Sequence, residues 1–329
     1  MWITNFFKNL FKDKNTPMPN GLVPSPIDYR DIPLSAVSTG VNPTPASYQI
    51  PYKLTIKNQG IKPYCVAYAG TTIKEYLERR QGNIIEFDPD WLYKQCKLID
   101  GLMPGQEGTT FRAMLLVLKN VGCLPLGGDT NDLKTIAKYR IAGYAYVNCD
   151  FNSIKRAIYE FGAILIGFVG SNGGWQTAYI RIPKPGEVTW GHATTGIAFD
   201  VTYVNGQNSW GDQWGSGGLF QFLQTYTPFE VWAVISDLPD NWQDLLPQPN
   251  DKPKYTFTVN LLPGYNNADV KALQDCLKWL GCMAKTQTST SYYGPITVAA
   301  VKIFQGRYGI LQTGNVGPLT IQKLNDLFQ

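Results

Sequence analysis

Histidine is nearly absent: the chain of 329 residues contains one, His192. This count excludes any mechanism that needs two imidazoles, such as a histidine-rich zinc site or a pair of acid–base histidines. The six cysteines form no C-x-x-C pair, which removes a cysteine-based structural zinc site as well. We therefore expect no bound metal and no cofactor. Six cysteines in a chain of this length also argue against a dense disulfide framework, although one or two bridges stay open, for example between Cys96 and Cys123.

Charge of either sign is sparse, with 29 Lys and Arg against 25 Asp and Glu and a net charge of +4. Because this small excess forms no basic cluster, it gives no reason to expect nucleic acid as a partner. Long apolar runs are missing too, and no stretch approaches the roughly 20 apolar residues that span a bilayer. We expect neither a nucleic-acid partner nor a transmembrane segment.

The N-terminal residues 1–11 are rich in apolar side chains but are interrupted by Asn5, Lys8 and Asn9, and no small-residue cleavage site follows them. They make a poor signal peptide. Their apolar positions at 3, 6, 7, 10 and 11 have helical spacing. This spacing favours a short amphipathic helix on the surface, or a segment that docks onto a membrane or a protein partner.

The length predicts about two domains. Prolines recur through residues 13–51, so we expect an N-terminal amphipathic and extended arm over residues 1–24, which leads into a first domain over residues 25–237. A linker rich in proline and aspartate covers residues 238–254. A small second domain occupies residues 255–329.

The periodicity of the first domain changes along its length. Helical spacing of apolar residues predicts helices over residues 65–80, 111–119 and 153–161. Runs of β-branched and aromatic residues then predict strands over residues 163–169, 193–201, 218–222 and 231–235. Helices first and strands later indicate an α+β arrangement rather than an alternating parallel one.

The second domain is predicted to be all-α. Residues 268–280 place apolar side chains at helical spacing behind Asn266 or Asn267 as candidate N-caps. Two further helices are expected over residues 294–305 and 317–324, each opened by a Gly-Pro-x-Thr turn, at an offset of 23 residues. In these turns we expect the glycine to relieve backbone strain and the threonine to cap the helix.

Three polar residues of the first domain form a candidate catalytic set. Cys65 stands where a loop gives way to a helix, and the positive end of a helix dipole favours the reactive thiolate form of a cysteine. His192 lies at the head of a predicted strand, 127 residues later, and Asn208 lies 143 residues after Cys65. Taken singly, each has a structural reading: a buried small residue, a core histidine and an amide that caps a loop.

Taken together, these residues resemble the papain family of cysteine peptidases. The matching motifs are Lys57-Asn58-Gln59-Gly60, Gly191-His192-Ala193, Asn208-Ser209-Trp210-Gly211-x-x-Trp214-Gly215 and Gly217-Gly218-Leu219-Phe220. The resemblance covers about residues 25–237 and implies a two-lobe fold, one lobe helical and one an antiparallel sheet. It also implies that Cys65 is the nucleophile, His192 the general base and acid, and Asn208 the residue that orients the imidazole.

The same resemblance suggests three supporting roles. Gln59 would donate its amide to the oxyanion hole, together with the backbone N–H of Cys65. Trp210 would cover the His–Asn hydrogen bond and help to form the leaving-group side of the cleft. The substrate-lining Gly-Gly segment of the family appears only as residues 105–109, in which Gly108 is the candidate for substrate binding.

The chain departs from the family in two other ways. The cysteine that usually stands three residues before the nucleophile is replaced by Lys62, so the bridge it would form is absent and Pro63 and packing must hold the loop. No long helical inhibitory propeptide precedes the domain. Either activity is controlled differently, or residues 1–25 partly cover the cleft.

The second domain resembles peptidoglycan-binding domains of the three-helix type. The supporting residues are Val270-Lys271-Ala272-Leu273-Gln274, Tyr292-Tyr293-Gly294-Pro295-x-Thr297-x-x-Ala300-Val301-x-x-Phe304-Gln305 and Gly314-Asn315-Val316-Gly317-Pro318-x-Thr320. This resemblance implies that residues 255–329 bind peptidoglycan. A small docking module without affinity for glycans is the alternative.

The two resemblances imply a cysteine endopeptidase that hydrolyses peptide or protein substrates and is directed to a bacterial cell envelope by its C-terminal domain. One alternative is a lysin, phage-borne or secreted, that cuts the peptide cross-links of peptidoglycan. Another is a catalytically inactive scaffold that serves as a wall-binding or virion structural protein. These readings place the protein at the cell envelope, outside the cell or on a virion, without a recognisable signal peptide.

Overall fold

The computed structural model describes residues 21–236 except 27, 29, 30, 39 and 41, and residues 252–329 except 281, 284–286 and 309. The expected N-terminal helix and nearly all of the expected linker at 238–254 lie outside the described residues. Of the described residues, those of 21–26 and 40–236 form one compact unit, and those of 27–39 and 252–329 form another. No described helix is long and apolar enough to cross a membrane.

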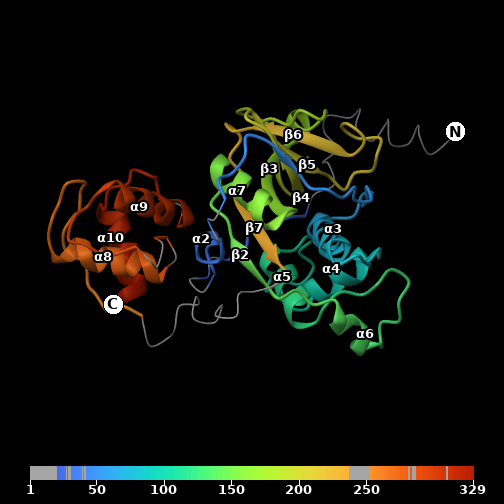
Figure 1. The fold of residues 1–329 in the computed structure, drawn as a ribbon, viewed down its shortest axis with the longest axis horizontal. Helices are drawn as coiled ribbons and strands as arrows, with labels where there is room; N and C mark the ends of the chain where they lie inside the picture. The colour runs from blue at the N-terminus through green and yellow to red at the C-terminus, as the bar shows by residue number, and fades with distance from the viewer. Residues whose placement is uncertain are drawn as a thin grey trace. The chain divides into compact units, whose positions relative to one another are not determined.

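The helices of the first unit are α3 (Cys65–Arg80), α4 (Pro89–Lys97), α5 (Phe111–Asn120), α6 (Leu133–Lys138) and α7 (Phe151–Phe161), with a short 3₁₀ turn at Asn172–Gly174. Helix α3 packs on α4 and α5 and also against strand β4, so it joins the helical part to the sheet (Figure 1). It is buried along nearly its whole length. Its charged residues Lys74, Glu75 and Glu78 are buried with partners: Glu75 accepts from the Lys57 ammonium at 2.6 Å, and Lys74 pairs with Glu78.

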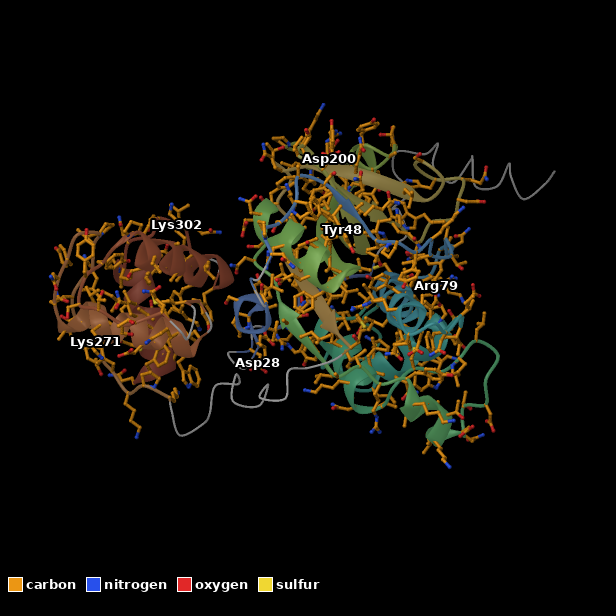
Figure 2. All side chains as sticks on the ribbon, viewed as in Figure 1. Asp28, Tyr48, Arg79, Asp200, Lys271 and Lys302 are labelled. Carbon is orange, nitrogen blue, oxygen red and sulfur yellow. The ribbon has the colours of Figure 1, made fainter. Side chains whose placement is uncertain are left out.

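The sheet of the first unit is antiparallel throughout. Its strands are β1 (Tyr48–Gln49), β2 (Gly143–Tyr146), β3 (Ile164–Ser171), β4 (Thr189–Phe199), β5 (Tyr203–Gln207), β6 (Leu219–Leu223) and β7 (Glu230–Ile235). Their order is β2-β7-β3-β4-β5-β6, with β1 paired to β4. Asp200, labelled in Figure 2, closes the turn from β4 to β5 by accepting the N–H groups of Thr202 and Tyr203.

These elements confirm the α+β prediction. The predicted helices at 65–80, 111–119 and 153–161 correspond to α3, α5 and α7, and the four predicted strands to β3, β4, β6 and β7. Helix α4 was not anticipated, although its N-terminus carries an ordinary signal: the Asp88 side chain accepts the N–H groups of Asp90 and Trp91, and Pro89 follows the cap.

The second unit contains the short helix α2 (Leu34–Val37) and the three predicted helices, α8 (Ala268–Trp279), α9 (Pro295–Arg307) and α10 (Pro318–Phe328). The last three surround an apolar core that includes Leu273, Val301 and Phe304. Asn267 caps α8 by accepting the Val270 N–H at 3.0 Å. Lys271 on α8 and Lys302 on α9 are exposed (Figure 2).

The Gly-Pro-x-Thr turns work differently from our expectation. Gly294 and Gly317 are the N-caps of α9 and α10 with φ of −89° and −96°, so neither relieves strain, and no side chain caps either helix. Instead, Thr297 accepts a hydrogen bond from the buried Gln274 at 2.9 Å, and Thr320 accepts one from the buried Gln305 at 3.1 Å. Each glutamine thereby joins one helix to the start of the next.

Candidate functional site

Cys65 is the first residue of α3, and the loop before it is held by polar contacts. The Gln59 N–H donates to the Ser209 carbonyl at 2.8 Å, and Gly60 donates to the Asn58 side chain at 2.9 Å. Gly60 has a φ of +59°, which favours glycine in this turn. These hydrogen bonds hold the loop, which lacks the disulfide usual in the family. They also place the start of α3 beside the segment that carries Asn208.

The Cys65 thiol is fully buried, and main-chain N–H groups surround it. Those of Ala193, Val66, Cys65 itself and Leu22 act on the sulfur and favour its charged form. Burial outweighs them and raises the pKa of Cys65 to about 12. Because Ala193 directly follows His192, the sulfur lies next to the strand segment that carries the imidazole. In this structure the cysteine is therefore a neutral thiol.

His192 lies in the middle of the sheet, opposite Phe168 in the pairing of β3 with β4. Its Nε2 is 2.8 Å from Asn208 Oδ1, and both residues are buried. The same Oδ1 accepts the Ser209 N–H at 2.8 Å, which identifies this atom as the amide oxygen. Since an amide oxygen only accepts, Nε2 must carry the hydrogen.

The neutral imidazole consequently has its lone pair on Nδ1. Within the described part of the chain, this buried nitrogen has no hydrogen-bond partner. A general base needs such a nitrogen with a free lone pair, and His192 directly precedes Ala193, whose N–H acts on the Cys65 sulfur.

Three tryptophans enclose the imidazole. Ring centres of Trp210, Trp175 and Trp190 lie 4.5, 5.4 and 6.0 Å from the centre of the His192 ring. This apolar enclosure removes water, and the burial lowers the pKa of His192 to about 4, against the raising effect of the Asn208 hydrogen bond. Trp210, which the family resemblance would place over the His–Asn hydrogen bond, lies nearest. Trp175 and Trp190 were not anticipated, and their only signal in the sequence is the adjacency of Trp190 to Gly191-His192.

Gln59 is buried at the same end of α3. Its Oε1 accepts the Ser209 hydroxyl at 2.6 Å, and its Nε2 donates to the Lys62 carbonyl at 2.7 Å. One amide hydrogen is thereby committed to the loop, and the second is left for another acceptor.

Gly108 is buried, and its polar main-chain atoms point into the helical part. Its N–H donates to the Tyr93 hydroxyl at 3.1 Å, and its carbonyl accepts from the Lys97 ammonium at 3.1 Å. The next residue, Thr109, forms a parallel bridge with Leu22. The main chain that pairs with the segment at Leu22 is therefore that of Thr109, one residue beyond the predicted Gly108.

All six cysteines are free, so the bridge considered between Cys96 and Cys123 does not form. Both residues are buried in the apolar core of the helical part, where they pack as small apolar side chains. Among the described residues, no group of three or more His, Cys, Asp or Glu side chains could hold a metal ion.

Sequence comparison gives a family match for the C-terminal part and a relative with a peptidase-like description. Residues 266–324 match the family described as a putative peptidoglycan binding domain. A 226-residue stretch, 58% of this chain and 72% of its relative, is 25% identical to an uncharacterized peptidase C1-like protein of Acanthamoeba polyphaga mimivirus.

Structural comparison gives the fold of the first unit. Xylellain, a cysteine protease from Xylella fastidiosa, superposes with a TM-score of 0.59 at 18% identity, over 67% of this chain and 96% of its own. A digestive procathepsin L of Tenebrio molitor larval midgut gives 0.53 at 17% identity, over 66% and 76% of the two chains. The chain therefore combines the papain-like fold of cysteine proteases with a C-terminal segment that matches the putative peptidoglycan binding domain.

Proposed function

We propose that this protein is a cysteine endopeptidase that hydrolyses peptide bonds with Cys65, His192 and Asn208. One observation carries the proposal: the Nε2–Asn208 bond leaves the lone pair of His192 on Nδ1, which has no partner among the described residues, and the N–H of the next residue, Ala193, acts on the Cys65 sulfur. The fold shared with cysteine proteases and the peptidase-like name of the viral relative support the same reading.

The reaction follows from these atoms. His192 Nδ1 takes the thiol proton, and the Cys65 sulfur forms a bond to the carbonyl carbon of the substrate. The resulting oxyanion would be stabilised by the Cys65 N–H and the second amide hydrogen of Gln59. When the C–N bond breaks, the protonated imidazole gives its proton to the departing amine. Water then attacks the thioester with His192 again as the base, which releases the acid and restores the thiol.

The Cys65→Ala variant tests this proposal, with Cys123→Ala as the matched control because it removes another fully buried free thiol. Hydrolysis of a denatured protein should vanish in the first variant and persist in the second. Equal hydrolysis by Cys65→Ala and the wild type would contradict the assignment.

We also propose the domain boundaries 25–237 and 255–329, and that the second domain binds peptidoglycan and brings the peptidase to a bacterial cell envelope. The family match at residues 266–324 supports this role. Tethering would raise the local substrate concentration without altering the chemistry. Sedimentation with purified cell walls should be retained in the full-length Cys65→Ala protein.

The same family match favours a second candidate, a lysin that cleaves the peptide cross-links of peptidoglycan. The chemistry at Cys65 would be unchanged, and only the substrate differs. Loss of turbidity of a cell-wall suspension with the wild type but not with Cys65→Ala, together with weak hydrolysis of casein, would favour the lysin over a general protease.

A further inference from the structure

The sheet of the first unit carries a cavity of about 300 Å³, which we call the amide hollow. It lies where β4, β5 and β6 run side by side (Figure 1), and β1 and the segments at Tyr179 and Ser216 complete its lining. The described lining residues do not include Cys65, His192 or Asn208. The amide hollow is therefore a cavity of small-molecule size that the proposed chemistry does not use.

One row of paired residues across the sheet forms the floor of the amide hollow. Gln49 on β1 pairs with Ala198 on β4, and Ala198 also pairs with Asn205 on β5. Asn205 in turn pairs with Gln221 on β6. Because directly paired residues project their side chains to the same face of a sheet, three amides stand in one row, with the small Ala198 between the first two.

The three amides are available to a ligand. No hydrogen bond within the described residues engages the side chains of Gln49, Asn205 or Gln221. By contrast, Gln207 on the same strand as Asn205 donates its amide to the Thr55 carbonyl at 2.8 Å. Each amide of the row offers both N–H donors and a carbonyl acceptor. The row therefore suits a ligand group that itself carries a donor and an acceptor.

The amide hollow has no charge to offer. None of the described residues that line it is Asp, Glu, Lys, Arg or His. An ionised ligand group would lose hydration here without gaining an opposite charge, so the chemistry of the lining favours a neutral ligand.

An exposed aromatic ring borders the row of amides. Tyr179 is 64% exposed, and its ring centre lies 6.1 Å from that of Tyr203 at an angle of 75°. Hydrogen bonds hold its segment to β6, since Gln221 donates to the Ala178 carbonyl at 2.7 Å and Ile180 donates to the Gln221 carbonyl at 3.1 Å. The ring is thus a large, positioned contact surface beside the amides.

From these features we infer that the amide hollow binds a neutral N-acetylated sugar of the N-acetylhexosamine class. The acetamido group of such a sugar has one N–H and one carbonyl, which match the carbonyl and N–H groups of the amide row. Its hydroxyls pair with the remaining amide groups and the Ser216 hydroxyl. The apolar C–H face of the sugar ring packs on Tyr179, and the acetyl methyl packs on the exposed Leu219.

This inference goes beyond the proposed hydrolysis, because none of its groups takes part in the chemistry at Cys65. The site would give the first unit its own hold on a glycan, separate from the binding proposed for residues 255–329. Two weak sites on one chain bind a long glycan strand more tightly than either site does alone.

The test is a titration of the full-length protein with N,N′-diacetylchitobiose, followed in amide NMR spectra. We expect saturable shifts for residues 178–179, 205–206 and 219–221. Cellobiose, which carries hydroxyls in place of the acetamido groups, should bind about tenfold more weakly, the loss expected for one or two neutral hydrogen bonds. Shifts confined to residues 255–329, or equal affinity for cellobiose, would overturn the inference.

Two variants and a matched control assign the binding to the amide hollow. Asn205→Leu replaces the central amide by an apolar side chain of similar size, and Tyr179→Ala removes the exposed ring. Each should raise the Kd for the disaccharide by about tenfold. Gln224→Leu changes an exposed amide that follows β6 and does not line the hollow, so it should bind as the wild type does. An unchanged Kd in Asn205→Leu and Tyr179→Ala would refute the site.

Sugar binding does not require hydrolysis, so the two proposals can fail separately. Cys65→Ala should bind the disaccharide with the affinity of the wild type. Saturable shifts at the amide hollow without peptide hydrolysis by the wild type would refute the peptidase and leave the sugar site. Hydrolysis without such shifts would refute the sugar site and leave the peptidase.

Discussion

The imidazole of His192 should titrate near pH 4 in the folded protein, well below the ordinary value of 6.5. The physical cause is burial among three tryptophan rings, which penalises the charged imidazolium. The difference of about 2.5 pH units corresponds to about 3.5 kcal/mol of unfolding free energy when the proton is fully bound, at about 1.4 kcal/mol per unit.

The sign of the effect on stability follows from the direction of the shift. The folded pKa lies below the unfolded one, so as the pH falls the unfolded chain binds the proton first. The contribution of His192 to stability is complete above pH 6.5 and is lost progressively as the pH falls toward 4. Burial also raises the pKa of Glu75 and Glu230, and their contribution to stability is lost as the pH rises. Both carboxyls are present in the wild type and in a His192 variant. Their contributions therefore cancel when the two proteins are compared.

The scarcity of histidine makes the measurement direct. In protein labelled at histidine, NMR should show one imidazole, so its titration needs no assignment. Chemical unfolding of the wild type and His192→Phe, each at pH 4 and pH 7, should show that the wild type loses about 3 kcal/mol more than the variant on acidification. A titration midpoint at pH 6 or above, or equal losses in the two proteins, would refute the account of the burial.

Two further predictions concern buried amides. Asn208→Ala removes one oxygen that accepts from both His192 and Ser209, so it should lower the unfolding free energy by about 2–4 kcal/mol, measured in urea. Asn208→Asp keeps the acceptor and should raise the pKa of His192. If Asn208→Ala is as stable as the wild type, the two hydrogen bonds to the Asn208 oxygen do not stabilise the fold. Gln305→Ala removes the link between α9 and the start of α10 and should cost about 2–4 kcal/mol in the second unit, seen by calorimetry, with exposed Gln322→Ala as the neutral control. If Gln305→Ala and Gln322→Ala show the same calorimetric unfolding transition, Gln305 is not a structural link.

Local signals in the sequence were sufficient for much of the fold. The apolar periodicity of residues 65–80 predicts α3 within the bounds observed, because a long helix repeats its pattern often enough to be read. Strand β5 at Tyr203–Gln207 was missed, since its polar Asn205 and Gln207 and its Gly206 give no β-branched run. Its pairing with β4 and β6, rather than its own propensity, makes it a strand.

The sequence by itself determined the candidate chemistry of this protein through its resemblance to the papain family, whose motifs surround Cys65, Asn208 and the single histidine. It left open whether residues 1–25 cover the cleft. Only the tertiary structure decided that the main chain at Leu22 lies by Gly191 and Cys65, and that Trp175 and Trp190 enclose His192. Apart from that of Trp190, these contacts join residues far apart in the chain, and they depend on backbone approach and shared burial, which leave no periodic trace in the sequence.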